Sequence, residues 1–422
     1  MQVKQRHYAW TIFIITFCSM LTAAIIRSSS GVLMVPLEKE FGWSRSSISL
    51  AVAVNLVLYG LSGPFAAALM ERYGLRKVMT GGMLLLVIGL GLTTVMTAKW
   101  QLFVLWGLVL GAASGVFLTV LGATVANRWF VKNKGLIIGM LTASTATGQL
   151  AFLPLLAYLA EHITWRASVL LIAGLGTIFL VIISIWMRNS PAEVGAVPYG
   201  APADYRETRL QGNPVAMAFS GLREGARRLD FWLLAGSFFI CGLSTSGLIG
   251  THFIPACIHA GIPELQAAGL LAFMGIFDIV GTTLSGWLSD RFNNRWLLFW
   301  YYGLRGLALL LLPYALFSNS YLFLIVFAVF YGLDWIATVP PTVKLTTEAF
   351  GREKGGVIYG WIFASHQIGS GIAAYGGGVL FTWMDTYTMA FMLAGSSCLI
   401  ATLLVLRVGG KAQVAVTEST SA

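Results

Sequence analysis

Long apolar segments separated by short polar turns dominate this chain. A helix rises about 1.5 Å per residue, so some twenty apolar residues cross a bilayer core of about 30 Å. Twelve segments reach that length, and their expected bounds are 9–36, 46–70, 77–97, 101–127, 135–160, 166–188, 230–258, 264–289, 295–317, 321–345, 355–381 and 385–407. The pattern predicts an all-α membrane protein with twelve transmembrane helices.

Composition and charge agree with this class. The chain is 57% hydrophobic and 10% charged, with a mean hydropathy of +0.78, whereas soluble domains carry roughly 25% charged residues. The net charge of +10 does not indicate nucleic-acid binding, because the basic residues lie between the apolar segments. With an even number of spans, about 21 of the 27 Lys and Arg fall on the side of the two termini, which predicts that both termini are cytoplasmic.

A polar connector divides the chain into two halves. Residues 189–229 contain four prolines and then Arg223, Arg227 and Arg228, which predicts an irregular segment followed by a short basic amphipathic helix. We therefore expect one six-helix bundle over 1–188, a cytoplasmic connector over 189–229 and a second bundle over 230–410. A disordered tail is expected over 411–422.

The two halves repeat each other. A shift of about 219 residues places Gly31 and Pro36 on Gly250 and Pro255. Spaced glycines in the fifth and eleventh segments also match, and small residues at such spacing allow helices to pack closely in lipid. Two copies with the same orientation predict a pseudo-symmetric transporter, with the substrate site between the halves. The repeat includes the first apolar segment, so we expect that segment to be retained although it imitates a signal peptide.

A charged loop after the eighth segment carries a family resemblance. The pattern Gly286-x-x-x-Asp290-Arg291, followed by Arg295, resembles the loop between the second and third helix of each half of major facilitator superfamily transporters. A second partial copy lies in the first half. The resemblance implies that these loops act as conformational gates, through Glu71, Arg72, Arg76, Asp290, Arg291 and Arg295.

Two other stretches resemble the monocarboxylate transporter family, especially its bacterial branch. One is Trp129–Lys134 followed by Gly139, Ala143 and Gly148; the other is 31–45. The resemblance implies a bacterial inner-membrane protein that carries a small organic anion. That family pairs an Asp in the eighth helix with an Arg one turn later, but here Thr282 follows Asp278. A substrate-binding Arg must therefore come from elsewhere, or the substrate class differs.

Ionisable residues inside the spans are the main candidates for the site, because a charge at the bilayer centre costs about 2.5–3.5 kcal/mol. Asp278 begins a polar stripe with Thr282, Ser285 and Ser289 that either lines a cavity or bonds a neighbouring helix. Burial raises a carboxyl pKa and a nearby Arg lowers it, so Asp278 is a candidate for proton uptake.

Further candidates lie in other spans. Arg27 either binds a substrate carboxylate or forms an ion pair or outward-pointing anchor. Arg305 and Asp334 lie at equal depth on consecutive helices, which predicts an ion pair that is either permanent or broken during transport. His366 is a candidate proton relay or a hydrogen-bond donor to an anionic substrate, and otherwise a packing residue.

Polar and aromatic residues complete the predicted site. Asn55, Tyr59 and Gln149 face the same way as other polar residues on the second and fifth spans, and they either orient a ligand or bond another helix. Trp335 and Tyr59 are expected to cover the apolar part of a substrate. Pro340 and Pro341 predict a kink or gate in the tenth span.

No phosphate-binding loop, metal-ligand cluster or nucleophile–base arrangement is visible in the sequence, so we expect no cofactor, no metal and no enzymatic activity. The prediction is a secondary transporter of small organic anions, coupled to protons, that works as a monomer by alternating access. The alternatives are proton-driven efflux of amphipathic compounds and a non-transporting membrane sensor on the same fold.

Overall fold

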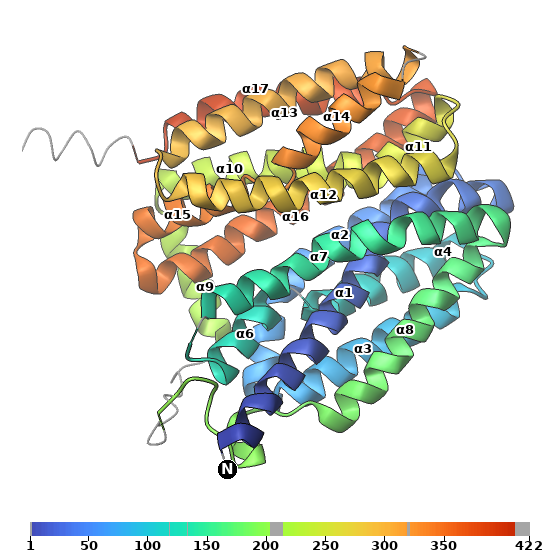
Figure 1. Cartoon of the computed structure of the whole chain (residues 1–422). Helices are drawn as coiled ribbons and strands as arrows, with labels where there is room; N and C mark the ends of the chain where they lie inside the picture. The colour runs from blue at the N-terminus through green and yellow to red at the C-terminus, as the bar shows by residue number, and fades with distance from the viewer. Residues whose placement is uncertain (1, 118, 133, 203–213, 319–320, 410–422) are drawn as a thin grey trace, which may run out of the picture. The chain divides into compact units, whose positions relative to one another are not determined.

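Helices make up most of the part of the chain that our computed structural model describes, which comprises residues 2–117, 119–132, 134–202, 214–318 and 321–409. The chain forms two compact units, Met1–Ala216 and Met217–Ala422 (Figure 1). Their boundary lies inside the predicted connector. The predicted tail over 411–422 and part of the connector lie outside the described residues.

The first unit contains the spans predicted for the N-terminal half. Its helices are α1 (Gln2–Phe41), α2 (Arg45–Tyr73), α3 (Leu75–Thr93), α4 (Lys99–Leu102), α5 (Gly111–Ser114), α6 (Thr119–Trp129), α7 (Lys134–His162) and α8 (Trp165–Trp186). The fourth span is irregular, because a π-helix, η1 (Phe103–Leu110), and a 3₁₀ turn, η2 (Gly115–Phe117), interrupt it. A second 3₁₀ turn, η3 (Pro191–Val194), follows α8.

The second unit contains the predicted C-terminal spans. Its helices are α9 (Pro214–Gly225, which starts just before the boundary), α10 (Leu229–Gly242), α11 (Gly250–His259), α12 (Glu264–Ser289), α13 (Asn294–Phe317), α14 (Tyr321–Asp334), α15 (Val339–Phe350), α16 (Arg352–Met384) and α17 (Thr388–Leu406). A π-helix, η4 (Leu243–Ile249), joins α10 to α11.

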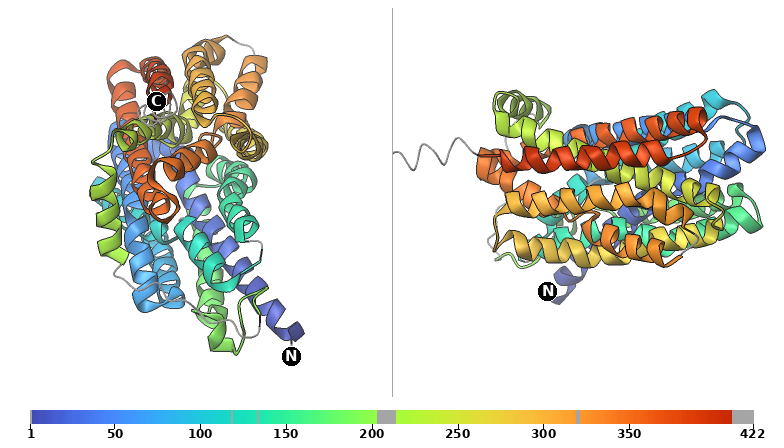
Figure 2. Two further views of the ribbon diagram at one scale, coloured as in Figure 1. Left: turned by 90° about the vertical axis from the view of Figure 1, so that its left-hand side faces the viewer. Right: turned by 90° about the horizontal axis from the view of Figure 1, so that it is seen from above.

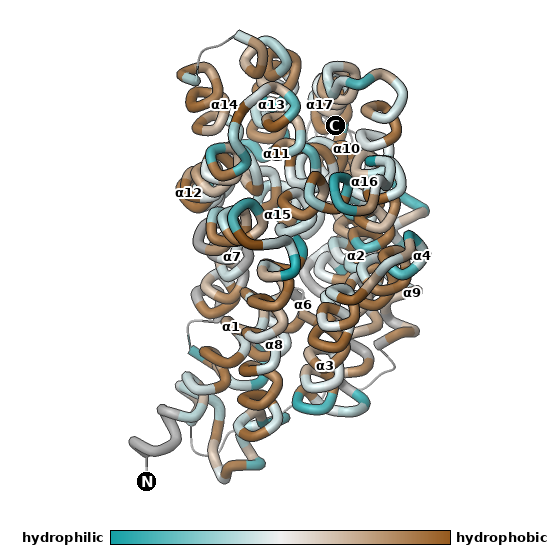
Figure 3. Tube along the Cα trace, turned by 90° about the vertical axis from the view of Figure 1, so that its right-hand side faces the viewer, coloured by the Kyte–Doolittle hydropathy of each residue, from teal (hydrophilic) through white to brown (hydrophobic). Residues whose placement is uncertain are grey.

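The predicted class, an all-α membrane protein, is confirmed. Within the described residues, ten helical segments are long and apolar enough to cross a membrane. The 29-residue α7 and the 33-residue α16 lie where the sequence predicts the fifth and eleventh spans, so the structure is consistent with twelve spans. Apolar residues colour most of the helices in Figure 3, and polar residues gather mainly near helix ends.

Helix pairing within each unit follows the sequence repeat. In the first unit, α1 packs along α7, α2 along η1, and α3 along α8. In the second unit, α10 packs along α16, α12 along α14, and α13 along α17 (Figure 2). Glycines permit some of these approaches, since a Cβ on Gly281 of α12 would collide with the carbonyl oxygen of Leu333.

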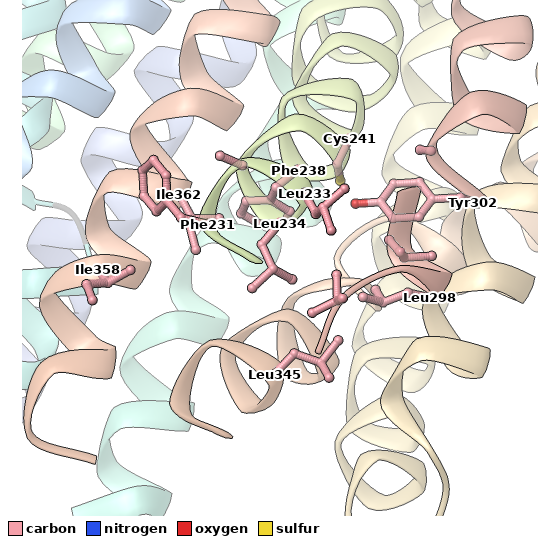
Figure 4. Packing of buried hydrophobic residues seen from close by; sticks show 14 of the residues in the cluster. Phe231, Leu233, Leu234, Phe238, Cys241, Leu298, Tyr302, Leu345, Ile358 and Ile362 are labelled. Atoms are coloured by element: carbon pink, nitrogen blue, oxygen red, sulfur yellow. The ribbon is translucent and has the colours of Figure 1, made fainter. Parts of the chain in front are cut away.

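Buried apolar side chains form a cluster in the interior of the second unit. It joins side chains of α10, α13, α15 and α16, including Phe238, Leu298, Leu345 and Ile362 (Figure 4). Cys241 and Tyr302 belong to this cluster (Figure 4), and Cys241 also contacts Arg305, one of the polar residues described below.

The two described pieces of the connector are attached to different units. Tyr199 donates its N–H to the Trp129 carbonyl at 2.8 Å and accepts from the Val131 N–H at 2.9 Å, both in the first unit. In α9, the Ala218 carbonyl accepts from the Trp361 indole at 2.8 Å, and Glu224 pairs with Lys354 at 2.7 Å. A short helix is therefore present in the second part of the connector, but α9 includes only Arg223 and ends before Arg227 and Arg228.

Candidate functional site

The tenth span is interrupted near its middle. Helix α14 ends at Asp334 and α15 begins at Val339, with a turn over residues 335–338 between them. Pro340 and Pro341 lie in the first turn of α15, where the missing N–H groups need no helical partner. The sequence predicted a kink at these prolines, and the structure places the interruption directly before them.

Helix α12 supplies two side chains that bond this interruption. Asp278 Oδ1 accepts from the Thr282 hydroxyl at 2.9 Å and from the backbone N–H of Ile336 at 3.0 Å. About two turns further along the same face of α12, Ser285 donates its hydroxyl to the Ala337 carbonyl at 2.6 Å. The predicted polar stripe is therefore the face of α12 that contacts the interrupted span, as its helical spacing requires.

Helix α13 supplies the third side chain, the buried guanidinium of Arg305. Its Nε donates to Asp334 Oδ2 at 2.6 Å, and another nitrogen donates to the Asp334 carbonyl and, at 3.3 Å, to the Trp335 carbonyl. The equal depth of these residues in the sequence predicted the ion pair, and the structure forms it. The guanidinium also bonds the C-terminal carbonyls of α14, where a positive charge is favourable.

Cys241 is a polar partner that the sequence did not indicate. Its Sγ accepts from Arg305 at 2.9 Å and lies 3.2 Å from the Thr338 hydroxyl. This contact has a physical reason: a guanidinium has five donors, and the interior of a membrane protein offers few acceptors. No local pattern around Cys241 signals this contact.

The charges in this region are unevenly balanced. Arg305 and Asp334 form a neutral pair, whereas the groups that donate to Asp278 are the Thr282 hydroxyl and the Ile336 N–H, both of which are neutral. Asp278 is only 4% exposed. A buried carboxylate without a cation is costly, and the hydrogen bonds from these two neutral donors compensate the charge of Asp278 only in part.

Aromatic side chains border this polar region. Trp335 is buried and meets Tyr331 edge to face at 5.7 Å between ring centroids, and Tyr331 donates to the Ser244 carbonyl in η4 at 2.8 Å. His366 of α16 lies against the rings of Phe238 and Phe363, at 4.8 and 5.7 Å. Hydrophobic periodicity did not predict the π-helix η4, and π-helical segments are frequent at functional sites.

The first unit holds a separate cationic position. The half-buried Arg27 guanidinium lies over the Tyr59 ring, 5.2 Å from its centroid. Among the residues described by the structure, no carboxylate is paired with Arg27. Asn55, for which the sequence left open a ligand contact or a bond to another helix, donates to the Trp106 carbonyl of η1 at 2.7 Å, and its contact with a ligand stays a prediction. The side chain of Gln149 lies outside the described residues.

The two charged loops that resemble the family motif contact helix ends within their own units. Arg76 donates its backbone N–H to the Asn189 side chain at 3.1 Å and its guanidinium to the Ser184 carbonyl. In the second unit, Asp290 pairs with Lys344 at 2.9 Å and Arg291 lies over the Trp287 ring at 4.0 Å. Arg72 lies over the Tyr73 ring, and Arg295 lies beside Gly409. The side chain of Glu71 lies outside the described residues. The role of these loops as gates stays a prediction.

The predicted site residues thus fall into two groups. Arg27, Asn55 and Tyr59 lie in the first unit, and Asp278, Thr282, Trp335 and His366 lie in the second. Within the second unit the structure connects Asp278 and Thr282 to the backbone beside Trp335. Convergence of the two groups in one cavity stays a prediction.

Known proteins resemble this chain over nearly its whole length. The family model described as Major Facilitator Superfamily matches residues 12–374 and 272–420. An uncharacterized MFS-type transporter, YcxA of Bacillus subtilis, is 23% identical and covers 90% of both chains. Monocarboxylate transporter 12-B of Danio rerio is 25% identical (94% of this chain, 85% of the relative), and monocarboxylate transporter 13 of Bos taurus is 27% identical (92% and 86%).

A solved structure matches the fold. The crystal structure of a D-xylose-proton symporter superposes with a TM-score of 0.73 at 13% sequence identity, covering 94% of this chain and 97% of the other. At this identity the match supports the fold and carries no information on the substrate.

Proposed function

The chain belongs to the Major Facilitator Superfamily, and on that premise we propose that it transports small organic anions, such as monocarboxylates, together with protons. Transport proceeds by alternating access between the two sides of the membrane. The relatives named monocarboxylate transporters support this substrate class.

The position of Arg27 is the observation that carries the proposal. A guanidinium inside an apolar span requires a counter-charge, and an aromatic ring satisfies it only partly. Arg27 lies over Tyr59 without a paired carboxylate among the described residues. A substrate carboxylate would complete the site, because two parallel N–H groups of the guanidinium match its two oxygens.

Proton coupling is proposed from Asp278. An anion that crosses with one proton adds no net charge to the membrane interior, and a buried acid without a cation partner is suited to carry that proton. His366 provides a second titratable group, and Trp335 and Tyr59 provide apolar surface for the rest of the substrate. Thr282 keeps Asp278 in place through its hydrogen bond.

Uptake of radiolabelled lactate or pyruvate into proteoliposomes tests the substrate class and the coupling. We expect accumulation with an inward proton gradient and only slow equilibration without it. Equal uptake in both conditions would remove the coupling. Absence of carboxylate uptake, together with dye sensitivity of cells that lack the gene, would favour efflux of amphipathic compounds instead.

Substitution of Arg27 tests the anion-binding role. We expect Arg27→Gln to lower lactate uptake about 10- to 100-fold, because hydrogen bonds to charged groups contribute about 1.5–3 kcal/mol. Tyr59→Phe keeps the ring and should retain most uptake. Arg407→Gln removes an exposed charge at the end of α17 and serves as the matched control. Full activity of Arg27→Gln would contradict the role.

A further inference from the structure

We propose that Asp278 transmits protonation to the interrupted tenth span through the backbone N–H of Ile336. This inference rests on the proposed function and deepens it, because it identifies which buried acid is coupled and what it moves. In this mechanism Asp278 is a positioning residue that acts on the backbone of span ten and does not itself contact the substrate.

The interruption depends on side chains from other helices. Its Ile336 N–H is bonded by Asp278, its Ala337 carbonyl by Ser285, and its Trp335 carbonyl by Arg305. Lipid offers no partners for free backbone groups, each of which costs several kcal/mol. These three side chains therefore determine whether the interruption keeps its conformation.

Of these three contacts, only the one from Asp278 changes with pH. The Ser285 hydroxyl does not titrate, and a guanidinium stays protonated. Asp278 is ionisable, and its two hydrogen-bond donors are neutral. When its carboxylate takes up a proton, the acceptor loses its charge, and charge-assisted hydrogen bonds are about twice as strong as neutral ones. Protonation thus weakens the contact between α12 and Ile336.

Asp334 differs from Asp278 in having a cation partner, because Arg305 lies 2.6 Å from its carboxylate. Other charged or titratable groups on the helices packed against α12 include Lys344 of α15, which pairs with Asp290, Tyr331 of α14, which donates to the Ser244 carbonyl, and His252 of α11, which bonds the Ala374 carbonyl at 2.7 Å.

The first unit contains a related contact that cannot respond to protons. Asn55 of α2 bonds the Trp106 carbonyl in the irregular fourth span, as Asp278 of α12 bonds the irregular tenth span. The second and eighth spans are counterparts in the sequence repeat, and so are the fourth and tenth. An amide does not titrate, so of these two contacts only the one in the second unit is sensitive to protons.

Protonation of Asp278 then changes the backbone conformation at Trp335 and at the start of α15. Trp335 immediately precedes Ile336, and its side chain is buried against Tyr331. Weakening the Ile336 contact frees the turn over 335–338 to rearrange while Arg305 still bonds the end of α14. Proton uptake on α12 is thereby converted into movement of the half-helix α15 relative to α14.

Hydrogen–deuterium exchange of the full-length protein in nanodiscs tests this directly. After correction for the intrinsic pH dependence of exchange, we expect peptides that cover 335–342 to exchange about five- to tenfold faster at pH 5 than at pH 8. Asp278→Asn, which mimics the neutral acid, should exchange fast at both pH values. Asp385→Asn, which changes an exposed acid in the loop after α16, should behave as the wild type.

Ser285→Ala separates this mechanism from general loosening. It removes a contact that no proton alters, so exchange should rise at both pH values and the difference between them should persist. In lactate counterflow, Asp278→Asn should flatten the pH profile, whereas Ser285→Ala should change the rate and keep the profile.

Identical exchange of 335–342 in Asp278→Asn and the wild type at both pH values would overturn the inference. If the wild type transports no carboxylate at all, the proposed function fails, yet the exchange experiment still decides whether Asp278 controls the interruption. The two failures are therefore distinguishable.

Discussion

In the second unit, several buried polar groups are bonded to one ion pair, Arg305–Asp334. Arg305 is 1% exposed and uses its donors on the Asp334 carboxylate, on two backbone carbonyls and on the Cys241 thiol. Desolvation of two charges costs nearly as much as their attraction returns, so such a pair adds little net stability. Removal of one partner is a different matter, because it leaves the other charge buried and uncompensated.

Double substitution measures this asymmetry. We expect Arg305→Leu or Asp334→Leu alone to lower the stability of the second unit by about 3–5 kcal/mol, seen as a lower Tm of the purified protein in detergent. Arg305→Leu/Asp334→Leu should recover much of that loss. Arg223→Gln, which changes an exposed side chain of α9, should leave Tm unchanged. A double variant as unstable as the sum of the two single variants would argue against this account.

At the scale of helices, close approach depends on a few glycines. Gly281 of α12 lies against the Leu333 backbone of α14, and Gly369 of α16 lies against the Phe239 carbonyl of α10. The sequence predicted that spaced small residues permit such packing, since dispersion contacts replace the hydrophobic effect in lipid. The approach of α12 to α14 also brings Asp278 within reach of Ile336.

Two alanine substitutions on the same helix compare a tight and an open glycine. Gly281→Ala should destabilise the protein by about 1–3 kcal/mol or more, because the backbone of α14 must shift. It should also raise hydrogen exchange over 335–338. Gly269→Ala, whose Cβ meets nothing within 4 Å, should be neutral in both measurements. Equal Tm values for the two variants would show that α12 and α14 do not pack as described.

The whole molecule consists of two units, each with its own interior, and their sequences repeat one pattern. Both contain an irregular span contacted by a polar side chain from the span two positions earlier. They differ in chemistry: the first presents the cation of Arg27, and the second presents the acid of Asp278. The anion–proton transport that we propose uses both groups, one from each unit.

Reporter fusions test the predicted orientation of the whole chain. Because basic residues favour the cytoplasmic side, we expect a fluorescent protein fused after residue 409 to be fluorescent and an alkaline phosphatase fused there to be inactive. A phosphatase inserted beside Lys99, in a loop predicted on the opposite side, should be active. The reverse result at both positions would invert the topology.

The amino-acid sequence alone determined the membrane class, the apolar spans and the repeat, because the length and polarity of a segment decide whether it can cross a bilayer. It also indicated that Arg305 and Asp334 would meet, since their depths follow from counting residues along two consecutive helices. The tertiary structure decided which groups Asp278 and Cys241 contact. Ile336 is 58 residues from Asp278 and Arg305 is 64 from Cys241, and periodicity gives the face of a helix but not the neighbour opposite it. The exact turn at which the tenth span breaks depended on the same contacts, because its backbone groups are satisfied by side chains from other helices.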